Sequence, residues 1–157
     1  MRSLPRTLAR PLARFVLHPW HRLTRGATLG VRILLVDAEN RVLLVRHTYA
    51  PGWMLPGGGV EHGQSCLDAV RCELDEEVGV TLAEAPRLVG ILPNFRHQPG
   101  DHVALYYATD WHREPRKSRE IAEIGLFPLV AIPEAATGAT RRRIDEYRGL
   151  APLADEW

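Results

Sequence analysis

The sequence predicts one mixed α/β domain, and three observations point to that class. The chain has 157 residues, which suits a single domain with a sizeable core. Its apolar fraction of 45% and charged fraction of 25% are ordinary for a globular protein. Short apolar segments with strand character stand on both sides of a helical stretch that follows the glycines at 57–59. Strands and helices are therefore expected to share one core.

Two apolar segments early in the chain predict a β-hairpin. Residues 27–37 and 41–48 are both rich in Val and Leu, and a short turn separates them. Arg46 and His47 stand at the far end of the second segment, close to where the glycines begin. They are either solvated charges at a strand end or, for Arg46, a contact to a substrate phosphate.

The helical stretch after the glycines presents two different faces. Its core side is predicted by apolar residues at helical spacing: Leu67, Val70, Leu74 and Val78. At roughly 100° per residue, Glu73, Glu76 and Glu77 fall together on a neighbouring face. Three carboxylates on one face repel one another unless a cation lies between them, and hard divalent ions such as Mg²⁺ bind carboxylate oxygens. This face therefore predicts a metal site.

The second half of the chain predicts further strands and a closing helix. In order, we expect a strand at 86–94, a strand at 102–109, a basic loop at 110–118 and a helix at 137–148. The polar loop between the two strands contains Phe95 and Arg96, and such loops often carry specificity, so both are candidate substrate contacts. The tail after Gly149 is expected to be frayed or loosely packed.

Residues 1–24 form a basic N-terminal extension before the expected domain at 25–150 and a C-terminal tail at 151–157. Apolar residues recur at every fourth position in the extension, and arginines recur on the opposite side, as in an amphipathic helix that Pro11 would kink. The pattern suits a helix packed on the domain or on a partner subunit, a helix at a membrane surface, an arm for an anionic substrate, or an organelle transit peptide.

The composition favours a cytoplasmic protein with a small substrate. Cys66 and Cys72 stand six apart on one predicted helix and cannot easily bridge, so a reducing compartment is the simple interpretation. No apolar run reaches the length of a membrane span. The net charge of +1 gives no broad basic surface, so nucleic acid is not the expected partner.

Residues 57–80 resemble the Nudix box, whose pattern is G-x5-E-x7-R-E-U-x-E-E-x-G-U, where U is aliphatic. Anchored on Gly58, the second half of the pattern matches at Glu73, Leu74, Glu76, Glu77, Gly79 and Val80. Two positions depart from it, because Gln64 stands at the first glutamate and Cys72 at the arginine. A Trp-x-x-Pro-Gly-Gly run that begins at Trp53 strengthens the resemblance.

The resemblance implies a Nudix-type α/β/α sandwich with a mixed sheet, and it implies Mg²⁺- or Mn²⁺-dependent hydrolysis of a nucleoside diphosphate linked to another moiety. The implied metal ligands are a carbonyl near Gly57 and the carboxylates of Glu73, Glu76, Glu77 and the late acid Glu120, with Glu123 as second candidate. The implied catalytic groups are Glu73, Glu76 and Glu120. Gly58 and Gly59 would let the backbone approach metal or phosphate closely. Family members are often dimers, so a homodimer is compatible with the resemblance.

The two departures predict a weaker site. Gln64 keeps a polar oxygen but loses the charge, and Cys72 cannot pair with the glutamates as the family arginine does. Arg71 lies roughly 100° round the helix and cannot simply substitute. Either another cation, such as Arg46 or Arg96, fills the role, or the site binds metal with less order and turns over slowly. The alternative function is a weakened Nudix-fold module that binds a nucleotide or a regulatory ligand. The three retained glutamates favour the enzyme.

The sequence leaves the substrate open. Nudix relatives cleave nucleoside triphosphates, ADP-ribose, dinucleotides or sugar nucleotides. Beside the small-molecule enzyme and the binding module, a third functional alternative is hydrolysis at an RNA 5′ end. Phe95, Tyr106 and Trp111 are candidates to stack on a base, and each is also compatible with a structural role. Trp53 has the same two possible roles, stacking on a base or packing in the core, and core packing is favoured.

Overall fold

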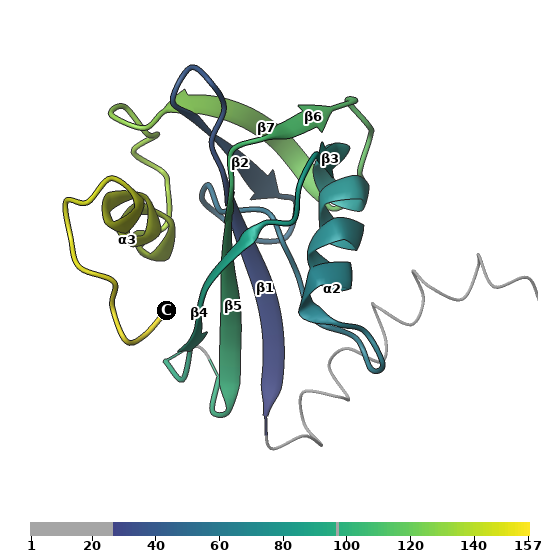
Figure 1. The fold of residues 1–157 in the computed structure, drawn as a ribbon, viewed down its shortest axis with the longest axis vertical. Coiled ribbons are helices and arrows are strands. Elements are labelled where there is room, and N and C mark those ends of the chain that lie inside the picture. Colours follow the sequence, from purple (N-terminus) through teal and green to yellow (C-terminus); the bar gives the residue numbers. More distant parts are fainter. Residues whose placement is uncertain (1–26, 97) are drawn as a thin grey trace, which may run out of the picture.

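The computed structural model describes residues 27–96 and 98–157, which form three layers (Figure 1). The helix α2 (Cys66–Glu73) and the π-helical segment η1 (Leu74–Val78) lie on one side of the strands. The helix α3 (Gly138–Tyr147) lies on the other side. The predicted α/β/α sandwich is therefore confirmed. The N-terminal extension at 1–24 lies outside the described residues.

The strands of the middle layer form a mixed arrangement. They are β1 (Thr28–Leu35), β2 (Arg41–His47), β3 (Val80–Leu82), β4 (Arg87–Pro93), β5 (Asp101–Ala108), β6 (Trp111–Arg113) and β7 (Ile121–Pro128). β5 pairs in parallel with β1 and antiparallel with β4. β2 pairs antiparallel with β7, and β3 pairs antiparallel with β6. Parallel and antiparallel pairs therefore share one layer, as predicted for a mixed sheet.

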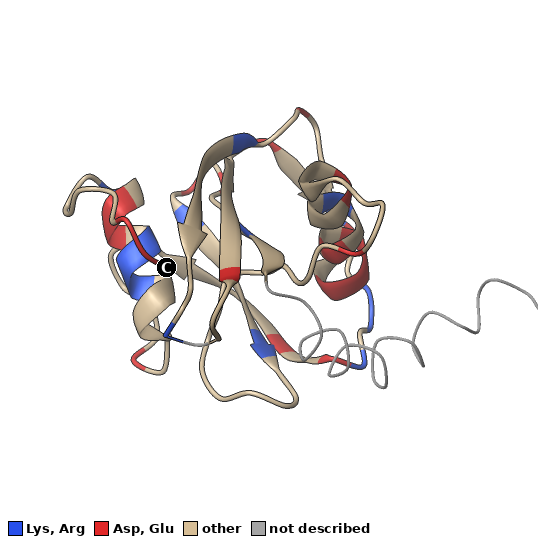
Figure 2. Ribbon diagram, turned by 90° about the horizontal axis from the view of Figure 1, so that it is seen from below, with Lys and Arg blue, Asp and Glu red and all other residues tan. Residues whose placement is uncertain are grey.

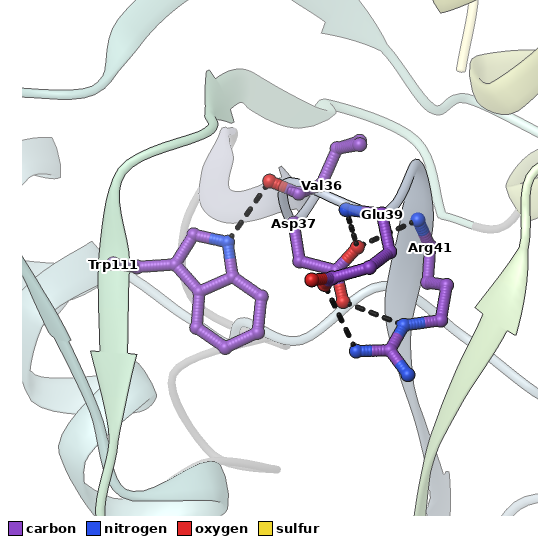
Figure 3. Close-up of polar contacts among 5 residues, drawn as sticks. All are labelled: Val36, Asp37, Glu39, Arg41 and Trp111. Carbon is purple, nitrogen blue, oxygen red and sulfur yellow. Dashed lines mark hydrogen bonds and ion pairs between the residues drawn. The ribbon is translucent and has the colours of Figure 1, made fainter.

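The predicted hairpin of β1 and β2 is wrong, although the turn between them is tight. Figure 3 shows Asp37 accepting hydrogen bonds from the backbone of Glu39 and Arg41, at 3.1 and 2.8 Å. Beyond a single bridge between Val36 and Val42, the two strands separate and pair with β5 and β7. Turn chemistry acts locally, whereas long runs of buried residues in both strands favour a position inside the sandwich with both faces covered.

The predicted basic loop at 110–118 contains the short strand β6, which pairs with β3. The indole N–H of Trp111 donates to the carbonyl of Val36 at 3.1 Å, which ties the start of β6 to the end of β1 (Figure 3). Three-residue strands with mixed polarity give no clear periodic signal, so both β3 and β6 were absent from the expectations.

Two hydrophobic cores fill the spaces between the layers. The core under α2 includes Val70, Leu74 and Val78, as the helical spacing predicts, and packs them on β1 and β2. The core under α3 is built on Leu34, Leu44, Leu105 and Ile144. In the described part of the chain, no helix combines the length and apolar character needed to cross a membrane.

The C-terminal tail is docked, which corrects the expectation of a frayed or loosely packed end. Arg143 and Glu146 on α3 form a buried ion pair at 2.7 Å. Glu146 also accepts a hydrogen bond from the backbone of Ala154 at 3.0 Å, and the backbone N–H of Trp157 donates to Pro93 at 2.9 Å. The tail therefore covers this ion pair and gives Glu146 a backbone hydrogen bond, which helps to offset the cost of burying the charge.

Candidate functional site

The glycine run lies directly against β1. The carbonyl of Gly58 accepts from the N–H of Val31 at 2.8 Å, and Pro56 accepts from Ile33 at 3.1 Å. Gly57 has a φ of 137°, and a Cβ there would collide with the Val31 carbonyl. Only glycine fits this conformation and this close approach. The first residues of the Nudix-like box are thus held beside the middle of β1.

Two buried carboxylates converge on this glycine run. Glu77 accepts a hydrogen bond from the backbone N–H of Gly57 at 2.9 Å. A Cβ added to Gly58 would lie 2.5 Å from Glu73 Oε1, so the Glu73 carboxylate lies against the Gly58 backbone. Glu73 is 5% exposed and Glu77 is 4% exposed. Two like charges buried this close together stabilise the fold only when donors or a cation offset them.

The end of the box helix is π-helical, and the three glutamates on it differ in exposure. The N–H of Gly79 donates to the carbonyl of Leu74, the wide closure that ends η1. Each residue of a wide turn advances by less than the α-helical 100°, so Glu77 stays on the side of Glu73 while Glu76 rotates toward solvent. Glu76 is exposed. Of the three carboxylates predicted to share one face, two are therefore buried and the third is exposed.

Two side chains from the strands lie near Gly57 and Glu77. Arg32 on β1 donates through Nη1 to the carbonyls of Gly57 and, at 3.1 Å, Leu55. His47 at the end of β2 is buried, and its Nε2 lies 3.9 Å from Glu77 Oε1. Burial, with a smaller contribution from the nearby charge of Arg32, lowers the pKa of His47 to about 4. His47 is therefore neutral at pH 7.

Glu120 is placed beside the same end of β2. Its carbonyl accepts from the backbone N–H of Thr48 at 2.8 Å, which puts Glu120 next to the residue that follows His47. The second late candidate, Glu123, instead pairs with Arg46 at 2.8 Å. Both late acids thus lie beside the end of β2, Glu123 opposite Arg46 and Glu120 opposite Thr48.

The predicted substrate-binding cations have partners of their own. Arg46 pairs with Glu123 and lies 5.9 Å from the ring of Trp53. It also lines a shallow pocket of about 420 Å³ together with His47 and Tyr49. Arg96 pairs with Glu156 of the C-terminal tail at 3.4 Å. The ion-pair partners of these two guanidinium groups are thus Glu123 and Glu156, and not the box glutamates beside which one of them was expected to replace the missing arginine.

The aromatic candidates differ in their exposure. Phe95 is 57% exposed and packs its ring edge on His102. Tyr106 is buried in the core under α2, and Trp53 packs against Phe127 with ring centroids 4.9 Å apart. Trp111 holds the end of β1, as described above. Phe95 is therefore the candidate among them with most ring surface open to a ligand.

The two departures from the box also have visible local roles. The side chain of Gln64 accepts from the backbone N–H of Glu61 at 3.0 Å and closes the loop before α2. Cys72 is half-buried and free, and Arg71 is exposed. Across residues 27–96 and 98–157, no three His, Cys, Asp or Glu side chains gather closely enough to form a ready metal cluster.

Sequence reasoning missed Arg32 and His47 as members of this site. His47 had been noted only as a strand-end charge beside Arg46. Arg32 had one usable signal, since it is the sole charged residue in an otherwise apolar or small-residue strand at 28–35. A lone arginine in such a strand needs acceptors, and here the carbonyls of the glycine run supply them.

The distribution of charge on the described residues is mixed. Figure 2 shows acidic and basic ribbon segments interspersed, with acidic segments prominent on the α2 side. Around the end of that helix, Arg116 pairs with Asp75 at 2.7 Å and Arg113 donates to the carbonyl of Val78 at 3.0 Å. Cations from the segment after β5 thus brace the outside of the helix end.

Comparisons with known proteins agree with the geometry. The family model described as NUDIX domain matches residues 26–147. The chain is 31% identical over 101 residues to Nudix hydrolase 25 of Arabidopsis thaliana, covering 60% of this chain and 56% of that protein. It is 34% identical over 70 residues to the RNA pyrophosphohydrolase of Ruthia magnifica subsp. Calyptogena magnifica, covering 41% and 39%. The chain therefore spans less than two thirds of these relatives.

A solved structure matches over more of its length. The crystal structure of a MutT NUDIX hydrolase from Burkholderia pseudomallei superposes with a TM-score of 0.66 at 27% sequence identity. The match covers 77% of this chain and 98% of that one. The fold of the described domain is thus shared with that protein over almost its whole length.

Proposed function

The chain belongs to the Nudix family, and from that membership we propose that it hydrolyses the pyrophosphate bond of a nucleoside diphosphate linked to another moiety. The observation that carries the proposal is the convergence of Glu73 and Glu77 on the backbone of Gly57 and Gly58. Burying two like charges is unfavourable for folding alone. The arrangement is instead suited to a divalent cation and the phosphates it would bring.

The donor set fits Mg²⁺ or Mn²⁺, because hard divalent ions prefer oxygen ligands. Glu73 and Glu77 would hold the ion, with the Gly57 carbonyl, Glu76 and Glu120 as further oxygen donors. The Gly57 carbonyl already accepts from Arg32, and a carbonyl oxygen has a second lone pair. When bound, a divalent ion neutralises phosphate oxygens and lowers the pKa of a bound water.

The chain's own residues have separable tasks in this proposal. Gly58 and Gly59 would let a phosphate approach the backbone, because they carry no side chain. A side chain at Gly58 would in addition displace the Glu73 carboxylate. Arg46 would bind a phosphate after leaving Glu123, as both side chains are about half exposed, at 45% and 50%. Glu120 or Glu76 would take the proton from the attacking water. Phe95 and Arg96 are exposed and available to select the leaving group.

A small nucleotide derivative is the proposed substrate. The shallow pocket beside Arg46 and His47 is open to solvent, and it would let Arg46 reach a phosphate of such a substrate. One relative is named an RNA pyrophosphohydrolase, so a triphosphorylated RNA 5′ end belongs in any test. Both cysteines are free, which supports action in the reducing cytoplasm.

The second candidate function is a Nudix-fold binding module with little turnover. The observation that favours it is Cys72, which removes the cation that the box normally places beside its glutamates. In that case the site would still bind a divalent ion and a nucleotide, but the phosphates would be held less precisely.

The experiment is a turnover assay over a panel of substrates with Mg²⁺ and with Mn²⁺. The panel contains nucleoside triphosphates including 8-oxo-dGTP, ADP-ribose, NADH, dinucleotides and 5′-triphosphorylated RNA. Glu77→Gln is the test variant, and Glu84→Gln in an exposed turn is the matched control. The enzyme proposal expects metal-dependent turnover that collapses in Glu77→Gln alone. Metal binding without turnover would favour the binding module, and neither property in the parent would contradict both.

A further inference from the structure

The missing arginine of the box leaves a charge problem at the site. Two carboxylates, Glu73 and Glu77, are buried against the glycine run. Position 72 carries a half-buried cysteine, which offers no permanent positive charge. The neighbouring Arg71 is exposed, one residue round the helix. Position 72 of the box helix therefore supplies no cation to this pair.

Arg32 reaches the glycine run from the opposite side. It lies on β1, and its Nη1 donates to the carbonyls of Gly57 and Leu55. Gly57 is the same residue whose N–H donates to Glu77. One residue of the loop is thus held at both ends, with its N–H on a carboxylate from the helix and its carbonyl on a guanidinium from the sheet.

This double attachment sets the position of the loop relative to the glutamates. Because Gly57 packs on the backbone of Val31 and Arg32, a shift of the loop would break contacts with β1. Gly58 follows immediately and lies against the Glu73 carboxylate. The charge of Arg32 also reaches His47, whose Nε2 stands 3.9 Å from Glu77. Arg32 therefore acts on the Gly57 backbone, which bonds Glu77 directly and leads into Gly58 beside Glu73.

Four other arginines of the described residues have partners elsewhere. Arg113 donates to the carbonyl of Val78, and Arg116 pairs with Asp75. Arg46 pairs with Glu123, and Arg96 pairs with Glu156. Among the described residues with printed contacts, Arg32 is the arginine that joins the glycine run itself.

We propose that Arg32 is a positioning residue that supplies, from β1, the ordering cation that Cys72 no longer supplies from the box helix. It fixes the Gly57–Gly58 backbone and offsets the charge of Glu73 and Glu77, so that these carboxylates keep one geometry for a divalent ion. The inference rests on the proposed function, because it concerns the same site. Residues that orient ligands in this way typically change metal affinity or activity by about 10–100-fold when removed.

The test compares Mn²⁺ affinity and turnover in four proteins: the parent, Arg32→Met, Arg32→Met with Cys72→Arg, and Arg141→Met. Mn²⁺ binding is measured by calorimetry and by its electron paramagnetic resonance signal, without substrate. Arg141 is the matched control, since it also donates to backbone carbonyls, those of Pro133 and Glu134, but on α3. Thermal unfolding in chelator reports whether each variant is folded.

We expect Arg32→Met to weaken Mn²⁺ binding about tenfold or more and to lower kcat more than it raises KM. The added Cys72→Arg is expected to restore much of both losses, whereas Arg141→Met should match the parent. Arg32→Lys keeps the charge but cannot donate to both carbonyls as the guanidinium does, so its Mn²⁺ affinity and kcat should lie between those of the parent and Arg32→Met. This variant replaces Arg32→Met in the test if the methionine variant does not fold.

Three outcomes would overturn the inference. One is a folded Arg32→Met with the Mn²⁺ affinity and kcat of the parent. Another is an equal loss in Arg141→Met, which would mean a general effect on the fold. The third is a loss that Cys72→Arg does not restore at all. A parent that neither binds Mn²⁺ nor hydrolyses any substrate would instead remove the proposed function itself, and this inference with it.

Discussion

The two faces of the sandwich bury charge in opposite ways. On the α3 face, Arg143 and Glu146 form an ion pair at 2.7 Å, and the C-terminal tail covers it. On the α2 face, Glu73 and Glu77 carry the same sign and are buried against one glycine loop. Two buried opposite charges neutralise each other without any ligand. Two buried like charges repel each other, and a bound cation would relieve that repulsion. The contrast separates a structural use of buried charge from the functional use proposed for Glu73 and Glu77.

The largest expected effect breaks the structural half of this contrast. Arg143→Met should lower the free energy of unfolding by about 3–5 kcal/mol, because Glu146 would stay buried without its partner. Denaturant titration measures this change. The double variant Arg143→Met with Glu146→Leu should recover most of the loss. A single variant as stable as the parent would show that the pair is not what closes this face.

The next effect breaks the functional half. Glu77→Gln should lower turnover by about 100-fold or more, because it removes a proposed ion ligand and weakens the hold on Gly57. Its unfolding temperature in chelator should equal or exceed that of the parent, since one of two like charges is gone. Steady-state kinetics and thermal unfolding provide the two measurements. A Glu77→Gln variant that lost stability but kept turnover would show that Glu77 serves the fold and not the reaction.

A pH titration sharpens the contrast on the α2 face. The folded-state pKa of His47 is about 4, below its ordinary value of 6.5, because burial disfavours the charged imidazolium. The unfolded chain therefore takes up the proton first, and stability that is complete above pH 6.5 is lost as the pH falls toward 4. In chelator, the parent should lose about 2 kcal/mol more than His47→Gln over this window. Parallel pH profiles would contradict the prediction.

The smallest effect concerns the approach of the loop to Glu73. Gly58→Ala places a Cβ where the Glu73 carboxylate now lies, 2.5 Å from Oε1, so that carboxylate has to move. We expect about a tenfold loss of kcat with little change in unfolding temperature. Gly63→Ala is the matched control for position, because nothing lies within 4 Å of its added Cβ, although its positive φ adds backbone strain. Equal turnover in Gly58→Ala and the parent would contradict the proposed role of that contact.

Much of the α2 face could be predicted from the sequence because its signals are local. The glycines, the apolar spacing of Val70, Leu74 and Val78, and the pair Glu73 and Glu77 all lie within one short stretch, and the structure places them together. The exposure of Glu76 could not be predicted, because a regular helix and a π-helical segment fit the same residues until the wide turn is seen.

The features that failed depend on contacts between distant segments. The turn at Asp37 is as tight as a hairpin requires, yet β1 pairs with β5 and β2 with β7. In the same way, nothing in the sequence around Arg46 or Arg96 shows that each has an acid within 4 Å, or that Arg32 has the carbonyl of Gly57. Strand partners and ion-pair partners are fixed by the tertiary arrangement, not by spacing.

The most direct test of the central claim is the shift in unfolding temperature that Mn²⁺ produces. A ligand that binds only the folded protein raises its stability in proportion to the logarithm of ligand concentration over Kd. The account predicts a clear rise for the parent and for the control Glu84→Gln, and little or none for the double variant Glu73→Gln with Glu77→Gln. An equal rise in all three proteins, or none in the parent, would contradict the claim that the buried pair on the α2 face is a divalent-ion site.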